Sequence, residues 1–121
     1  MILDHITVAV SNFDRSKAFY ERALQPLGIA VLFQFPGGAG LGKGRPQFWI
    51  NAGAAGAQRA HIAFAAANRA EVDAFYAAAI AAGGKDNGKP GPRPQYHPNY
   101  YGAFVLDPDG YNVEAVCHAA P

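Results

Sequence analysis

Three residues of the sequence, His5, His61 and Glu114, have the side chains of a metal centre. Glu114 lies in the otherwise apolar stretch 111–117, where a carboxylate costs free energy unless it is paired or bound to a metal. Imidazole nitrogen and carboxylate oxygen together suit a first-row divalent ion such as zinc, manganese, iron(II), nickel or cobalt. Three protein ligands leave positions open for water and substrate, which is typical of a catalytic metal site.

The two histidines are related by an internal repeat. When the sequence is shifted by 56 positions, identical residues align across an alternating stretch and a helical stretch without a gap. The aligned residues include His5-Ile6 with His61-Ile62, Phe19-Tyr20 with Phe75-Tyr76, and Gly28 with Gly84. We therefore expect a single domain, 1–121, made of two related modules, 1–56 and 57–121.

Strand periodicity predicts where the histidines point. In the first module Ile6 and Val8 alternate with His5 and Thr7, which is the period of a β-strand. Because the apolar residues must face a helix, His5 must face the other, open side of its sheet. The same argument places His61 on the open side of the second sheet. Two open faces brought together would form a cleft that contains both imidazoles.

Each module is predicted to consist of a strand, a helix and then two or three strands. The first helix is capped by Ser11 or Asn12, and the second by Asn68 with Glu71 three residues later, as in a capping box. Gly28 ends the first helical run. The later strands are predicted at 29–35, 46–50, 101–106 and 111–117, and the Pro/Gly-rich stretch 88–98 is predicted to be a surface loop.

Composition limits the classes of function. A chain of 121 residues, half of them hydrophobic, fits one globular domain. The formal net charge of +1 gives no reason to expect nucleic acid or an anionic membrane surface as a partner. We expect no signal peptide, and no apolar run reaches the ~20 residues that cross a bilayer. The single cysteine, Cys117, cannot form an internal disulfide, so we expect a cytoplasmic protein.

Four segments make the chain resemble the vicinal-oxygen-chelate superfamily, which includes glyoxalase I, fosfomycin-resistance transferases, bleomycin-resistance proteins and extradiol dioxygenases. They are DHITVAV at 4–10, AFY at 18–20, HIAF at 61–64, and LDPDG at 106–110 with Val113-Glu114 after it. The resemblance implies an α+β fold in which two βαβββ modules form a partly open barrel. It also implies a homodimer and a divalent metal held by His5, His61 and Glu114, and it leaves open whether the modules pair within one chain or between two.

The resemblance implies a metal-dependent enzyme of glyoxalase-like type, a lyase or isomerase that chelates neighbouring oxygen atoms of a small-molecule substrate. Glyoxalase I enzymes carry a fourth ligand, usually Glu, where this sequence has the segment 47–50 without a carboxylate. Trp49 and Thr7 resemble the fosfomycin-type thiol transferases, whose serine-rich loop is absent here. A two-His-one-carboxylate set also suits iron(II) dioxygenases. A resistance protein that sequesters a drug or metabolite is a further alternative.

Several other side chains are candidates for contact with a substrate. Thr7 and His97 are candidate catalytic residues, His97 as a general acid or base. The candidate substrate-binding residues are Trp49, Arg93, Tyr96, His97 and Tyr100, with Arg93 as an anion contact. The alternative for this aromatic segment is a packed loop that covers one end of the barrel. His118 shares strand parity with Glu114, but chain-end fraying weakens it as a candidate.

Overall fold

The computed structural model describes residues 3–55 and 60–121. The predicted boundary between the modules, at residues 56 and 57, lies outside the described residues. The elements in chain order are β1 (Ile6–Val10), α1 (Phe13–Leu24), η1 (Gln25–Leu27), β2 (Ala30–Phe35), β3 (Gly38–Lys43), β4 (Arg45–Ala52), β5 (His61–Ala65), α2 (Arg69–Ala81), β6 (Lys85–Pro92), β7 (Tyr101–Leu106) and β8 (Asn112–Cys117).

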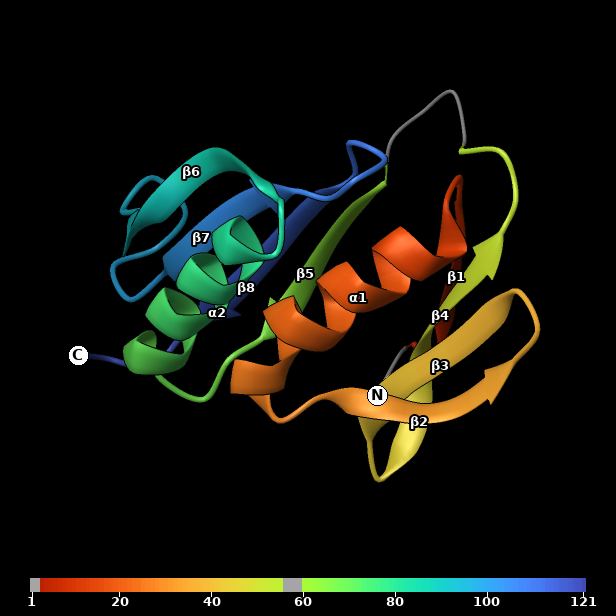
Figure 1. The fold of residues 1–121 in the computed structure, drawn as a ribbon. Coiled ribbons are helices and arrows are strands. Elements are labelled where there is room, and N and C mark those ends of the chain that lie inside the picture. Colours follow the sequence, from red (N-terminus) through yellow and green to blue (C-terminus); the bar gives the residue numbers. More distant parts are fainter. Residues whose placement is uncertain (1–2, 56–59) are drawn as a thin grey trace.

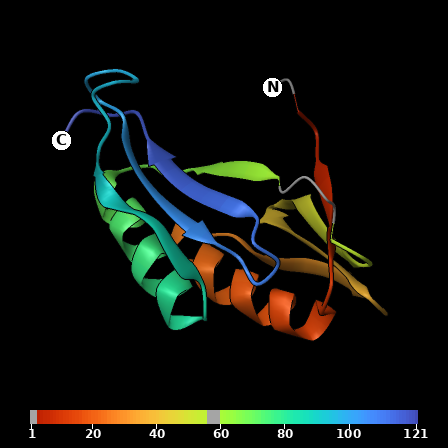
Figure 2. The ribbon, with the colours of Figure 1, turned by 90° about the horizontal axis from the view of Figure 1, so that it is seen from above.

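The strands form two mixed four-stranded sheets, with the orders β1-β4-β3-β2 and β5-β8-β7-β6. In each sheet the first strand pairs parallel with the last, and the other pairs are antiparallel. The two helices pack against each other, α1 beside the first sheet and α2 beside the second (Figures 1 and 2). The two sheets do not close on each other, which confirms the predicted α+β class with an open barrel.

Local signals explain both helix starts. The side chain of Asn12 accepts a hydrogen bond from the backbone nitrogen of Arg15 at 3.1 Å, and Asn68 does the same for Glu71 at 2.9 Å. The Glu71 carboxylate in turn accepts from the backbone nitrogen of Ala67. Each cap satisfies donors that have no partner inside the helix, as the sequence predicts.

Two strands differ from the prediction. β3 has three glycines among its six residues, and it forms because β2 and β4 pair with it on both sides. β6 extends to Pro92, so the predicted loop 88–98 is wrong for 88–92. Its pairing with β7 shifts register at Gly88, and β6 is an edge strand. An edge strand tolerates Pro90 and Pro92 because one of its sides needs no backbone donor.

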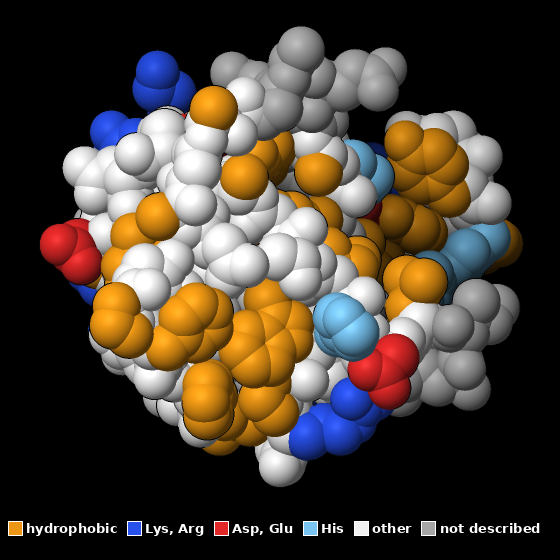
Figure 3. Space-filling view, turned by 90° about the vertical axis from the view of Figure 1, so that its right-hand side faces the viewer, with side chains coloured by type: hydrophobic (Ala, Val, Ile, Leu, Met, Phe, Trp, Pro, Cys, Tyr) orange, Lys and Arg blue, Asp and Glu red, His pale blue; other side chains and the backbone are white. Residues whose placement is uncertain are grey.

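The open face of the first sheet exposes a group of aromatic side chains. Phe33 and Phe35 are about half exposed, at 55% and 41%, and the Phe33 ring lies 6.0 Å from the Trp49 ring. Figure 3 shows hydrophobic side chains gathered on one face of the molecule, with histidine side chains at separate places beside them. The molecule therefore presents an apolar surface away from its helices.

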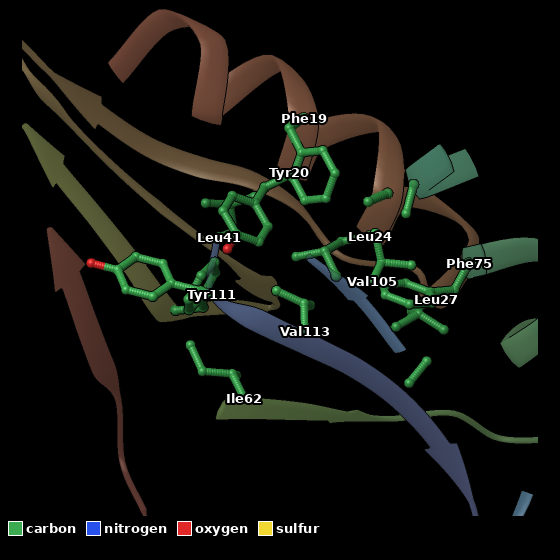
Figure 4. Close-up of a cluster of buried hydrophobic side chains, with 14 of the residues drawn as sticks. Phe19, Tyr20, Leu24, Leu27, Leu41, Ile62, Phe75, Val105, Tyr111 and Val113 are labelled. Atoms are coloured by element: carbon green, nitrogen blue, oxygen red, sulfur yellow. The ribbon is translucent and has the colours of Figure 1, made fainter. Parts of the chain in front are cut away.

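The core lies between the helices and the inner sides of both sheets (Figure 4). Phe19 and Tyr20 from α1 are fully buried, as are Phe75 from α2 and Val113 from β8. The Tyr20 ring meets the Phe48 ring edge-on, with centroids 4.9 Å apart. Within the described residues, no helix is long and apolar enough to cross a membrane.

Candidate functional site

His61 and Glu114 lie together on the open face of the second sheet. His61 begins β5 and Glu114 lies on the neighbouring strand β8, where it pairs in register with Ala63. The Nε2 atom of His61 is 3.1 Å from Oε1 of Glu114. The His61 side chain is 50% exposed, whereas the Glu114 side chain is only 2% exposed. The carboxylate therefore sits at the base of the site with the imidazole above it.

The other ring nitrogen of His61 determines what the pair can bind. Nδ1 lies 3.1 Å from the backbone oxygen of Asn112, and because a carbonyl oxygen only accepts, Nδ1 must carry the proton. In the neutral ring Nε2 then has a lone pair directed at a carboxylate oxygen of Glu114. Two such groups repel each other unless a positive charge, a proton or a metal ion, lies between them. Imidazole with its second nitrogen fixed in this way is the usual form of a metal ligand.

Tyr100 holds the second oxygen of the Glu114 carboxylate. Its hydroxyl group donates a hydrogen bond to Oε2. Burial, reinforced by this hydrogen bond, raises the pKa of Tyr100 above its ordinary value of 10.0, so the hydroxyl keeps its proton at neutral pH. Gly102 leaves the space for this contact, since a Cβ there would lie 3.1 Å from Oε2 and 3.2 Å from the Tyr100 ring.

A second pair of imidazoles lies beside Tyr100. Nε2 of His97 is 2.8 Å from Nδ1 of His118, and the two rings stack with centroids 5.0 Å apart. The Tyr100 ring meets both rings edge-on, at 5.5 Å from His97 and 5.3 Å from His118. Together with His61, Tyr96, Phe104 and Glu114, these residues line a pocket of about 320 Å³.

His5 lies in a different pocket, on the open face of the first sheet. This pocket, of about 370 Å³, is also lined by Asp4, Thr7 and Trp49. The Nδ1 atom of His5 donates to the Asp4 carboxylate at 2.8 Å, which leaves Nε2 as the available nitrogen. The hydrogen bond from His5, followed by the charge of Arg45, lowers the pKa of Asp4 below its ordinary value of 3.8.

The expected convergence of the three candidate ligands is incomplete within one chain. His61 and Glu114 meet, but His5 opens into the other pocket. Among residues 3–55 and 60–121, no group of three His, Cys, Asp or Glu side chains could hold a metal ion. The sequence leaves open whether the two open faces enclose a cleft within one chain or between two chains. In this chain the sheets are joined through α1 and α2 on their inner sides, and each open face has its own pocket.

The predicted substrate-binding residues are divided in the same way. Tyr96, His97 and Tyr100 surround the His61–Glu114 pair, whereas Trp49 and the candidate catalytic residue Thr7 line the pocket of His5.

Arg93 lines neither of these two pockets and instead contacts the backbone near it. Its guanidinium group donates to the backbone oxygens of Lys89, Gly91 and Pro92, at 2.8 to 3.3 Å, and lies 5.4 Å from the Phe104 ring centre. These contacts involve three of the five N–H donors of the guanidinium group and tie it to the backbone of β6.

Two residues of this site, His118 and Gly102, are not among the candidates predicted from the sequence. His118 has the same strand parity as Glu114, which is the signal that places it on the open face. Fraying was expected to remove it, but its hydrogen bond to His97 holds it against the pocket.

The comparisons with known proteins agree with this fold. The family profile described as Glyoxalase/Bleomycin resistance protein/Dioxygenase superfamily matches residues 2–115. A glyoxalase/bleomycin resistance protein from Albidiferax ferrireducens is 30% identical, with a TM-score of 0.84 over 97% of this chain and 99% of that one. No curated protein sequence matches the chain.

More distant solved structures share the fold alone. A glyoxalase/bleomycin resistance protein/dioxygenase family enzyme from Burkholderia phytofirmans is 20% identical, with a TM-score of 0.76 over 96% of this chain and 98% of that one. A glyoxalase I variant from Zea mays is 24% identical, with a TM-score of 0.70 over 98% of this chain and 45% of that one. From the profile match and the 30% identical relative, the chain belongs to the Glyoxalase/Bleomycin resistance protein/Dioxygenase superfamily.

Proposed function

We propose that this protein is a metal-dependent enzyme of glyoxalase-like type, a lyase or isomerase acting on a small molecule with neighbouring oxygen atoms. His61 and Glu114 of one chain provide two metal ligands, and His5 of the partner subunit provides the third. This proposal rests mainly on one observation: Nε2 of His61 lies 3.1 Å from Oε1 of Glu114. At the same time, Nδ1 of His61 donates to a backbone oxygen. A divalent cation is the group that best satisfies two such lone pairs.

His5 has the chemistry of the missing ligand. It occupies the position equivalent to His61 in the sequence repeat, on the open face of the other sheet. Its Nδ1 is likewise fixed, by Asp4, so that Nε2 is available to a metal. Its side chain is 55% exposed, and two aromatic residues of the same face, exposed Phe35 and half-buried Trp49, line its pocket. A second copy laid over this face would cover them and complete the site, and homodimers are the commonest assemblies.

The chain's own residues define what the completed site can do. A bound divalent ion would supply a Lewis acid that binds two neighbouring oxygens of the substrate and stabilises negative charge on them. Glu114 neutralises part of the ion's charge, and Tyr100 holds its carboxylate in place. The rings of Tyr96, Tyr100 and Phe104 line the pocket and exclude water from a bound molecule. His97, the candidate general acid or base of the sequence, lines the same pocket.

Metal analysis of the purified protein tests the proposal. We expect about one divalent ion per chain in the native protein and a loss of most of it in His5→Ala, His61→Ala and Glu114→Ala. Glu21→Ala is the matched control, because Glu21 only pairs with Lys17 on the surface of α1. Its metal content should equal that of the native protein. Melting temperatures by circular dichroism separate loss of a ligand from loss of fold.

The opposite result would indicate a different function for this protein. If the native protein binds no metal after incubation with each of zinc, manganese, nickel, cobalt and iron(II), the enzyme proposal is wrong. Tight binding of a drug or metabolite by such metal-free protein would then indicate a sequestering resistance protein.

A further inference from the structure

The His97–His118 pair is connected to the backbone in a way that fixes its protons. The backbone nitrogen of Asn99 donates to Nδ1 of His97 at 3.0 Å. The remaining nitrogen of His97, Nε2, lies 2.8 Å from Nδ1 of His118. Each of these ring nitrogens therefore has a partner, and together they form a chain of hydrogen bonds with a single direction.

The direction of this chain follows from which atoms can donate. A backbone N–H only donates, so Nδ1 of His97 must be without a proton, and the proton of the neutral ring is on Nε2. That proton points to Nδ1 of His118, which must accept it and therefore has none. The proton of His118 is then on Nε2. No hydrogen-bond partner of His118 Nε2 occurs in the described part of the chain, so this exposed N–H is open to water or to a ligand.

We propose that the Nε2–H of His118 is the group that binds a negatively charged oxygen of the substrate in the His61–Glu114 pocket. This inference rests on the proposed function, in which a metal ion makes substrate oxygens anionic. The class of ligand is an enolate or a catecholate, in which a second oxygen accompanies the metal-bound one. His97 and the Asn99 backbone act as positioning groups that hold the His118 proton on the outer nitrogen.

The charges around the pocket favour this role. Glu114 is the one residue among its lining side chains that carries a permanent charge, and that charge is negative. Arg93, whose guanidinium group lies over the Phe104 ring, donates to three backbone oxygens and does not line the pocket. An anionic oxygen entering this pocket thus has few protein donors available. The Nε2–H of His118 provides one, on a ring whose centroid is 5.3 Å from that of Tyr100.

Proton–nitrogen correlation NMR of the histidine rings tests the fixed tautomers without metal or ligand. We expect the neutral rings of His97 and His118 each to have a protonated Nε2 and an unprotonated Nδ1. His118→Gln and His97→Ala assign the signals. Rapid exchange between two tautomers, or a proton on Nδ1 of either ring, would overturn the inference.

Binding of nitrocatechol to the metal-loaded protein tests the donor itself. A hydrogen bond to a charged oxygen is typically worth a factor of about 10 to 100 in affinity, so His118→Phe should bind nitrocatechol weaker by that factor. His118→Gln keeps an N–H donor and should recover most of the loss. The absorption band of bound nitrocatechol reports the same effect, because losing the donor raises the pKa of its second hydroxyl group.

The outcomes separate this inference from the proposed function. Equal binding by the native protein and His118→Phe, with metal retained in both, overturns the role of His118 and leaves the metal centre standing. Failure of the native protein to bind metal, or of the metal-loaded protein to bind nitrocatechol, overturns the proposed function and this inference with it. His118 is exposed beyond the end of β8, and equal melting temperatures would show that its variants fold.

Discussion

The hydroxyl group of Tyr100 is the smallest feature on which the proposed metal centre depends. It donates to Oε2 of Glu114 while Oε1 faces His61, so the two carboxylate oxygens have different partners. A hydrogen bond of this kind fixes the orientation of a metal ligand and limits it to one metal-binding oxygen. Groups that orient ligands in this way typically contribute factors of about 10 to 100 to metal affinity.

We expect Tyr100→Phe to lower the affinity for zinc or cobalt by about 10-fold, because Glu114 becomes free to rotate. Competition titration with a metal-binding dye measures the affinity. The visible spectrum of the cobalt-loaded protein provides a second reading, since a change from one to two bound carboxylate oxygens alters the coordination number.

Tyr101→Phe is the matched control for this experiment. Tyr101 also donates to a carboxylate, that of Asp73 at 2.7 Å, but this carboxylate lies on α2 and outside the pocket. Its loss should leave metal affinity unchanged. Equal metal affinity in Tyr100→Phe and Tyr101→Phe would show that Tyr100 does not position the ligand.

At the scale of single residues, the sequence predicts which residues belong to the candidate site better than it predicts their hydrogen bonds. The repeat singles out His61, and the apolar surroundings of Glu114 single out that carboxylate; the structure places the two side chains 3.1 Å apart. The aromatic segment was expected to hold Tyr100 and His97 near the substrate, and both line the pocket. The hydrogen bonds of Tyr100 and His118 could not be predicted from the sequence, because they depend on how a loop folds back over the sheet.

At the scale of elements, the hairpin turn between β7 and β8 fastens the two halves of the molecule together. Asp107 is buried and accepts hydrogen bonds from the Tyr20 hydroxyl and from the backbone nitrogens of Asp109 and Tyr111. The Tyr111 hydroxyl donates to the backbone oxygen of Ala9 at 2.7 Å. These contacts join the first strand and helix to the last hairpin, and so they fix the sheets relative to each other.

We expect Tyr20→Phe to lower the free energy of unfolding by about 1 to 3 kcal/mol, since it leaves a buried carboxylate with one donor fewer. Urea denaturation at pH 7 measures this. The repeat provides the control: Tyr76 is the equivalent residue, half-buried, and its hydroxyl bonds to the exposed Asp86. Tyr76→Phe should cost less than about 0.5 kcal/mol. Equal effects of the two changes would contradict the role of the Tyr20–Asp107 contact.

The stability contributed by Asp107 should depend on pH. Burial, which outweighs its hydrogen bonds, raises the pKa of Asp107 above 3.8, so the folded protein binds this proton more tightly than the unfolded chain. Its contribution to the free energy of unfolding therefore increases as the pH falls through the raised pKa, and it levels off below 3.8. Urea denaturation of the native protein and of Asp107→Asn at a series of pH values measures this. The free energy of unfolding of the native protein should rise relative to that of Asp107→Asn as the pH falls. A difference that is constant with pH, or that shifts the other way, would be inconsistent with a raised pKa.

Elements with strong local signals were predicted from the sequence, and those held by their neighbours were not. Asn12 and Asn68 mark both helix starts, and 101–106 is a strand as predicted. The glycine-rich β3 and the proline-bearing β6 form because adjacent strands pair with them, which local composition does not reveal.

At the scale of the whole molecule, the repeat is divided between two open faces. Each face carries a histidine whose Nδ1 has a hydrogen-bond partner, and the second face also carries the candidate carboxylate ligand Glu114. The sequence predicts both faces, but it does not tell whether they enclose a pocket within one chain or between two. That depends on helix packing, and in this chain α1 and α2 join the halves on the sides away from the candidate ligands.

Mixing two inactive variants tests the shared metal centre most directly. His5→Ala keeps Glu114, and Glu114→Ala keeps His5, so a mixed dimer contains one site with all three ligands and one site that lacks two. After the two variants are unfolded together and refolded, we expect about one tightly bound metal ion per mixed dimer. Each variant alone should bind almost none. If the mixture binds no more metal than the separate variants, His5 of the partner subunit is not the third ligand and the proposed centre is contradicted.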